Sequence, residues 1–72
     1  MRFRVTYDKK ADAVYIYLGK VRAGESAGQV EAIPDKVILD FDATGRLIGI
    51  EILGAGGILP PGVCEEAEQI GD

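Results

Sequence analysis

Acidic side chains are the residues of this 72-residue chain best suited to chemistry. Carboxylates set close together can divide the roles of general acid and general base, or they can hold a hard divalent cation through oxygen ligands. Such a set would support a carboxylate-based hydrolase or a metal-binding protein. Its candidate members are Asp8, Asp12, Asp40, Asp42 and Glu51.

Turns give three of these carboxylates a simpler structural explanation. Asp42 opens a four-residue turn that ends at Gly45. Aspartate can accept a hydrogen bond from the backbone two residues on, and glycine adopts a positive φ without strain. Asp8 and Asp12 flank a second polar break between two apolar stretches. All three therefore fit structural roles.

The other two carboxylates lie in an apolar part of the chain. Glu51 has Lys36 as a candidate partner across a strand pair, whereas Asp40 stands beside an apolar run with no evident role. We favour structural roles for the whole acidic set. The sequence thus assigns no catalytic residue, no metal ligand and no cofactor-binding residue.

Composition excludes several other chemistries. With no histidine, the chain has neither a Ser-His-Asp nor a Cys-His arrangement. The lone Cys64 precedes Glu65 and Glu66, whose charges disfavour a thiolate. Residues 54–57 read GAGG, but a phosphate-binding loop needs a helix directly after it. We expect no helix before Pro60, so this stretch is predicted to be a linker.

Alternation with a period of two dominates the first 53 residues and is typical of β-strands. The stretch 12–18 is apolar on both faces, which indicates a central strand or one under an interface. We predict a mainly β fold, α+β at most, with one small antiparallel sheet of four to five strands. Its strands are expected at residues 2–8, 12–18, 36–42 and 46–53, with a weaker one at 29–33.

The chain divides into a β-rich domain, residues 1–53, and a Gly/Pro-rich tail, residues 54–72. Two turns of helix are expected within 63–70, where acidic residues lie near the positive end of the helix dipole. Any helix should be confined to the tail beyond Pro61. The tail is otherwise expected to be irregular.

Two apolar runs around the Asp42 turn predict a hairpin over residues 36–53. The expected register places Phe41 opposite Arg46, Leu39 opposite Ile48 and Val37 opposite Ile50. One face then collects Val37, Leu39, Phe41, Ile48, Ile50 and Ile52, and the other carries Lys36, Ile38, Asp40, Leu47, Gly49 and Glu51. A slip of one residue would bury an unpaired carboxylate among apolar side chains, which costs several kcal/mol.

Two stretches of the chain resemble a small prokaryotic family. YDKKADAVYIYL, residues 7–18, resembles its opening pattern YD-x-x-ADALYI-x-L, and VILDFDATGRLIGIEIL, residues 37–53, resembles its second pattern. The family is catalogued as domain of unknown function 2283. The resemblance covers most of residues 5–53 and implies a compact β-rich domain. It implies no activity, cofactor or catalytic residue.

The charge distribution bears on partners. The chain has a net charge of −4, although residues 1–22 carry six cations and two carboxylates. Nucleic-acid binding is disfavoured on an acidic chain, but it stays an alternative through Arg2, Arg4, Lys9, Lys10, Lys20 and Arg22. No apolar run approaches the roughly 18 residues of a membrane span. The N-terminus does not resemble a signal peptide, and a lone cysteine suits the cytoplasm.

Size and apolar surface together predict self-association. A 72-residue chain supports only a marginal core, and a lone cysteine cannot form an internal disulfide. We expect a homodimer whose interface uses residues 12–18 or the outer face of the hairpin. The candidate interface residues are Tyr15, Tyr17, Ile38, Leu47 and Leu53.

Three function classes follow from these features. The favoured class is a non-catalytic module for protein–protein interaction or regulation. The carboxylate-based metal protein or hydrolase is the first alternative, and the nucleic-acid-associated protein is the second. Stacking of tyrosines on bases would belong to the second alternative, but tyrosines on an acidic chain fit the rim of a protein interface better.

Overall fold

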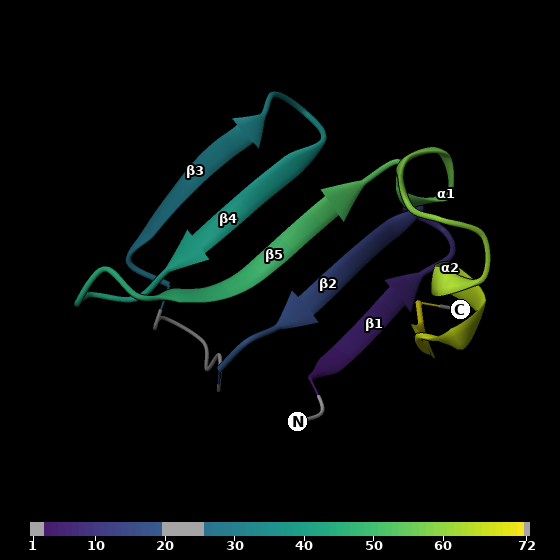
Figure 1. The fold of residues 1–72 in the computed structure, drawn as a ribbon, viewed down its shortest axis with the longest axis horizontal. Coiled ribbons are helices and arrows are strands. Elements are labelled where there is room, and N and C mark those ends of the chain that lie inside the picture. The colour runs from purple at the N-terminus through teal and green to yellow at the C-terminus, as the bar shows by residue number, and fades with distance from the viewer. Residues whose placement is uncertain (1–2, 20–25, 72) are drawn as a thin grey trace.

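A computed structural model describes residues 3–19 and 26–71 of the chain. Six strands form one mixed sheet, and two single-turn helices follow the fifth strand (Figure 1). The strands are β1 (Arg4–Asp8), β2 (Ala13–Tyr17), β3 (Gly28–Ile33), β4 (Val37–Phe41), β5 (Leu47–Leu53) and β6 (Glu68–Ile70). The helices are α1 (Ala55–Ile58) and α2 (Val63–Glu66).

The strand order across the sheet is β3-β4-β5-β2-β1-β6. The first five strands pair antiparallel, and β6 adds to β1 in parallel. The prediction of a small, mainly β fold with a helical tail is confirmed. The sixth strand is a feature of the tail that the sequence does not predict, because three residues are too few to show alternation.

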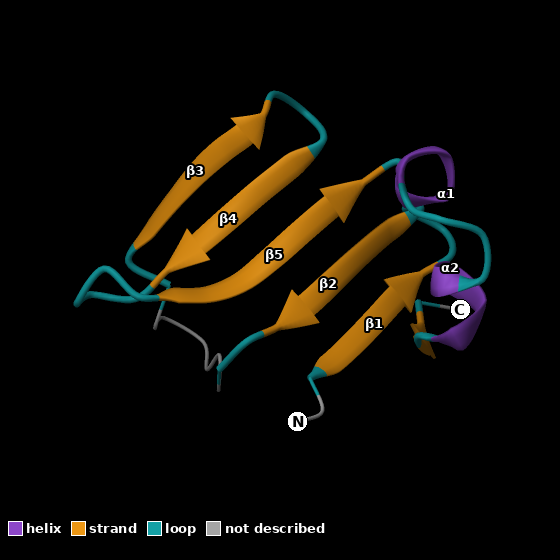
Figure 2. Cartoon of the chain, in the orientation of Figure 1, coloured by secondary structure: helices purple, strands orange, loops and turns teal. Residues whose placement is uncertain are grey.

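The tail departs from the predicted helix after one turn. α2 stops at Glu66, and Ala67 is extended at φ −70° and ψ 160°. Gln69 then turns back, and its side-chain nitrogen donates to the carbonyl oxygens of Cys64 at 2.8 Å and Ala67 at 2.9 Å. These bonds satisfy carbonyls at the helix end. Residues 68–70 are therefore free to pair with β1 (Figure 2).

The expectation of no helix before Pro60 is wrong. α1 forms directly after β5, because the turn between β1 and β2 supplies its cap. The backbone nitrogen of Ala55 donates to the carbonyl of Asp12 at 2.9 Å, and that of Gly56 donates to the Asp12 carboxylate at 3.0 Å. Both donors belong to the first turn of α1, where helical backbone N–H groups lack partners within the helix. A residue more than 40 positions away thus accepts two hydrogen bonds from the first turn of this helix.

The predicted hairpin forms, but its register is wrong by two residues. The turn pairs Asp42 with Arg46 through a backbone bond of 2.9 Å, which moves the register by one residue. A bulge between Asp40 and Phe41 then adds Ile48 as an extra residue on β5 and moves it by another. Because a total shift of two residues returns each side chain to the same face, Val37, Leu39, Ile50 and Ile52 stay on the face predicted for them.

The charge pair predicted between Lys36 and Glu51 is absent for the same reason. Glu51 lies opposite Ile38, and the carbonyl of Lys36 accepts a bond of 2.8 Å from the backbone of Leu53. Within the described ranges, the one ion pair joins Arg4 to Glu68, at 2.6 Å and on the surface. An exposed pair of this kind contributes about 0–1 kcal/mol.

The sheet has an inner face, which the tail partly covers, and an outer face. Two parallel rows of side chains cross the inner face, one residue from each of five strands. Row one is Tyr7, Val14, Ile52, Val37 and Ile33; row two is Val5, Ile16, Ile50, Leu39 and Val30. Alternation places Thr6, Tyr15, Tyr17, Ile38, Asp40, Gly49, Glu51 and Leu53 on the outer face.

The core lies where the tail meets row one. Val14 and Ala55 are completely buried and Ile52 is 6% exposed. Leu59 and Cys64 from the tail pack against this cluster. None of the helices in the described residues is long and apolar enough to cross a membrane.

Truncation of Ile52 should test the position of this core. We expect Ile52→Ala to lower the free energy of unfolding by about 2–5 kcal/mol, because it leaves a cavity at the most enclosed point. Glu51→Ala, one residue along on the outer face, should change it by less than about 1 kcal/mol. Urea unfolding followed by circular dichroism measures both. Equal losses would contradict this assignment of faces.

Candidate functional site

The five candidate carboxylates lie in three separate places. Asp8 and Asp12 belong to the turn between β1 and β2, Asp42 opens the hairpin turn, and Asp40 and Glu51 are on the outer face. Among the residues that the structure describes, no three Asp, Glu or Cys side chains are grouped as metal ligands would be. The five carboxylates are therefore not gathered at one site.

Two turn aspartates perform the structural roles predicted for them. The Asp42 carboxylate accepts bonds from the backbone of Thr44 at 2.9 Å and Arg46 at 3.0 Å, and from the Thr44 hydroxyl at 2.7 Å. These bonds, that of Arg46 foremost, lower the pKa of Asp42 below its usual value. Asp8 likewise accepts from the backbones of Lys10 and Ala11 at 3.0 and 3.2 Å.

Asp12 joins the tail to the sheet through its side chain. Besides capping α1, its carboxylate accepts a bond of 2.8 Å from the Tyr7 hydroxyl. That bond, followed by burial, raises the pKa of Tyr7 to about 12. Asp12 reaches both partners from a positive φ of 50°, which carries backbone strain for a non-glycine residue.

Asp40 is buried on the outer face at 4% exposure, and its role emerges only in the folded sheet. Its carboxylate accepts bonds from the Tyr15 hydroxyl at 2.6 Å, Gln29 at 2.8 Å and Ser26 at 3.4 Å. These donors come from β2, from β3 and from the residues before β3. Asp40 therefore connects the edge of the sheet to its centre. Burial of Tyr15, followed by its hydrogen bond to Asp40, raises the pKa of the Tyr15 phenol.

Gly49 makes the long reach of Tyr15 possible. Tyr15 comes from β2 and Asp40 from β4, so the phenol ring must cross β5 between them. It does so over Gly49, where a methyl group would overlap the Tyr15 hydroxyl and ring. Sequence alone gives no sign of this contact, because residues 15, 40 and 49 are far apart in the chain.

The predicted interface residues are spread over one face and one end of the sheet. Tyr15, Tyr17, Ile38 and Leu53 are half-buried on the outer face, and Leu47 is exposed beyond the bulge, opposite Phe41. The rings of Tyr15 and Tyr17 lie 4.6 Å apart, and the Arg4 guanidinium lies 4.9 Å above Tyr17. Contact of these residues with a partner stays a prediction.

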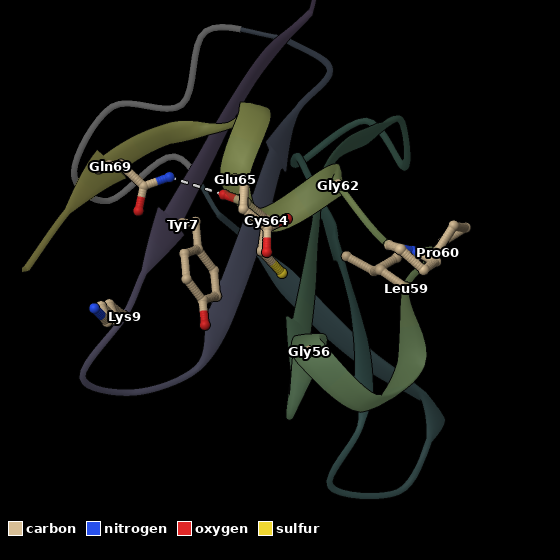
Figure 3. A pocket seen from close by; sticks show the side chains of 10 residues that line it. Tyr7, Lys9, Gly56, Leu59, Pro60, Gly62, Cys64, Glu65 and Gln69 are labelled. Atoms are coloured by element: carbon tan, nitrogen blue, oxygen red, sulfur yellow. Dashed lines mark hydrogen bonds between the residues drawn. The ribbon is translucent and has the colours of Figure 1, made fainter.

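A pocket of about 500 Å³ lies between β1 and the tail (Figure 3). The Tyr7 ring and the side chains of Leu59 and Pro60 give it apolar walls, and Lys9 and Gln69 lie at its polar side. Its size is within the range of small-molecule sites.

The groups in this pocket suit binding better than catalysis. Burial, foremost, raises the pKa of the Cys64 thiol, and the nearby Asp12 and Glu65 charges raise it further. The Tyr7 phenol is also held protonated. Both potential nucleophiles are therefore neutral at physiological pH.

Residues 4–55 match the family described as "Protein of unknown function (DUF2283)", which covers more than half of the chain. The chain belongs to this family. No curated protein and no solved structure matches the chain. The matched residues contain β1 to β5 together with the Asp12 cap, the Tyr15–Asp40 bond and Gly49.

The family match leaves out most of the tail. α2, β6 and the pocket walls contributed by Leu59, Pro60 and Cys64 follow residue 55. The resemblance seen in the sequence is confirmed, and it carries no activity to this chain. The part of the chain that the family shares is therefore the five-strand sheet with the start of α1.

Gly49→Ala should destabilise the fold by about 1–3 kcal/mol, because the added methyl group displaces the Tyr15 ring. In a Tyr15→Ala background the same change should have little further effect, since the ring is gone. A double-mutant cycle by urea unfolding measures this coupling. Additive losses would show that Gly49 does not accommodate Tyr15.

Tyr7 should make stability depend on pH under alkaline conditions. Its pKa is about 12 in the folded chain and about 10 when unfolded, so the native state favours the protonated phenol. This contribution is complete below pH 10 and is lost as the pH rises toward 12. Absorbance titration should show a phenolate step near pH 12 that Tyr7→Phe abolishes; an unchanged titration curve would contradict it.

Proposed function

We propose that this protein is a small non-catalytic interaction module that works as a homodimer. Its surface area carries the proposal. A folded monomer of 7.7 kDa is expected to expose about 4,300 Å². This chain exposes 5121 Å², about 800 Å² more than that.

The distribution of apolar side chains agrees with this surplus. Only four apolar residues of the described part are buried. Large apolar residues stay at least one-third exposed in six places, namely Phe3, Val30, Ile33, Leu47, Ile58 and Ile70. Contiguous apolar surface is typical of an interaction site, and Val30 and Ile33 on β3 continue the apolar rows of the inner face.

Site chemistry also supports an interaction module over the two alternatives. Asp8 and Asp42 stabilise turns, Asp12 caps α1, and Asp40 binds Tyr15 across β5. A hydrolase or a metal-binding protein would instead need such carboxylates grouped at one site. Among the described cations, Arg4 pairs with Glu68 at one end of β1, and Lys9 and Lys10 follow its other end. Lys36 precedes β4 and Arg46 precedes β5, so the described cations are spread over several turns and ends of strands rather than along one stripe. Arg2, Lys20 and Arg22, the other cations of the nucleic-acid alternative, lie outside the described residues.

We expect the module to act in the cytoplasm, because its lone cysteine suits a reducing compartment. A regulatory role through a protein partner is compatible with this setting. The homodimer would then be the unit that presents the remaining surface to that partner.

Sedimentation equilibrium at micromolar concentration should give a mass of twice 7.7 kDa. The physical reason is that a second copy covers apolar surface without any further sequence. Dilution into the nanomolar range and a 1 M NaCl series serve as controls, because an apolar interface should persist at high salt. A stable monomer at micromolar concentration would overturn the proposal.

A further inference from the structure

We infer that the homodimer forms through the uncovered part of the inner face, packed against the same surface of a second copy. This inference rests on the proposed function and adds the surface that carries it. The surface consists of row two and the β3–β4 end of row one. It lies opposite the face that holds Tyr15, Tyr17 and Ile38, so it replaces the dimer contact that the sequence predicted for those residues.

Row two is a continuous apolar stripe across five strands. Direct register pairs join Val5 to Ile16, Ile16 to Ile50, Ile50 to Leu39 and Leu39 to Val30. Val5, Ile16 and Ile50 are half-buried beside the core cluster, Leu39 is half-buried, and Val30 at the end of the row is 53% exposed. A stripe of five aliphatic residues on a sheet is the surface that a second sheet covers in a sandwich.

The tail leaves room for that second sheet. Its contacts with the core are centred on Val14 and Ile52 in row one. α1 and α2 gather at one end of the sheet, and in the described part of the chain neither helix lies over the half that contains β3 and β4 (Figure 1). At that half, Ile33 is 48% exposed and Val37 is half-buried.

The absence of charge among the described residues of the inner face makes it suitable for contact with a second copy. In a two-fold contact each surface meets itself, so any net charge on it is repelled. Neither row of the inner face contains a charged residue. The outer face instead carries an acidic excess in the described residues, with the carboxylates of Asp8, Glu31, Asp40, Glu51 and Glu68 against the cations Arg4 and Lys36.

The surface area fits the same occupant. The chain exposes 5121 Å², which exceeds the expectation for its mass by about 800 Å². Each partner buries about 800 Å² in an interface of standard size. One symmetric contact therefore brings the exposed area down to that of an ordinary folded protein.

Two adjacent residues of β4 provide a matched test. Leu39 and Ile38 are both half-buried, but they point to the inner and outer faces respectively. Leu39→Glu should raise the dimer dissociation constant by about 100-fold or more, because it places two unpaired carboxylates in the contact. Ile38→Glu should leave it within about threefold, since the outer face stays in water.

Val30→Glu provides a second inner-face variant, because this half-exposed edge residue tolerates a charge without unfolding the chain. Sedimentation equilibrium of all three variants measures the dissociation constant, and circular dichroism confirms the sheet. If Leu39→Glu loses the sheet, Val30→Glu decides, with about tenfold weakening or more expected.

The outcomes separate this inference from the proposed function. A monomeric parent protein overturns the homodimer itself and the interface with it. A dimeric parent weakened by Ile38→Glu, but not by the inner-face variants, overturns the interface and leaves the homodimer standing. A dimer that none of the three variants weakens also overturns the interface, whereas selective weakening by the inner-face variants supports it.

Discussion

Cover for one apolar sheet face is the constraint on which this structure depends. Five antiparallel strands expose two rows of apolar side chains on the same side, and a sheet alone has no second layer to bury them. The tail provides part of that layer, where Ala55, Leu59 and Cys64 meet Val14 and Ile52. A tail of this length covers one corner only. The remaining apolar area is what makes a second copy the simplest completion of the fold.

Two tyrosine–aspartate pairs hold this thin structure together, one on each face. Tyr7 donates to Asp12, which also caps α1, so the pair joins the covering tail to the sheet. Tyr15 donates to Asp40 across an intervening strand, so that pair ties the outer strands to the centre. In both, a neutral phenol donates a hydrogen bond to a carboxylate that forms no ion pair with a described residue. Such bonds replace part of the burial that a larger core would give.

The family region and the tail contribute different surfaces to the molecule. The matched residues 4–55 contain the apolar rows of five strands, both tyrosine–aspartate pairs and the glycine that Tyr15 crosses. The tail adds α2, β6 and the walls of a pocket. An interaction surface on row two would thus be built entirely from the family region, whereas ligand binding in the pocket would depend on the tail.

The sequence by itself determined the five antiparallel strands, the hairpin turn and the side of the hairpin that is apolar. These features depend on alternation and turn chemistry, which act over a few residues. The register predicted for the hairpin differs from the observed register by two residues, because the sequence gives no local sign of the bulge at Asp40. A shift of two residues leaves each side chain on its predicted face, so the apolar pattern does not reveal it. Only the tertiary structure decided the roles of Asp12 and Asp40, whose partners lie up to 44 residues away in the chain. It also decided that residues 68–70 form a strand, because their partner is β1 at the other end of the chain. Contacts at such separation depend on how the whole sheet assembles, so no local pattern can specify them.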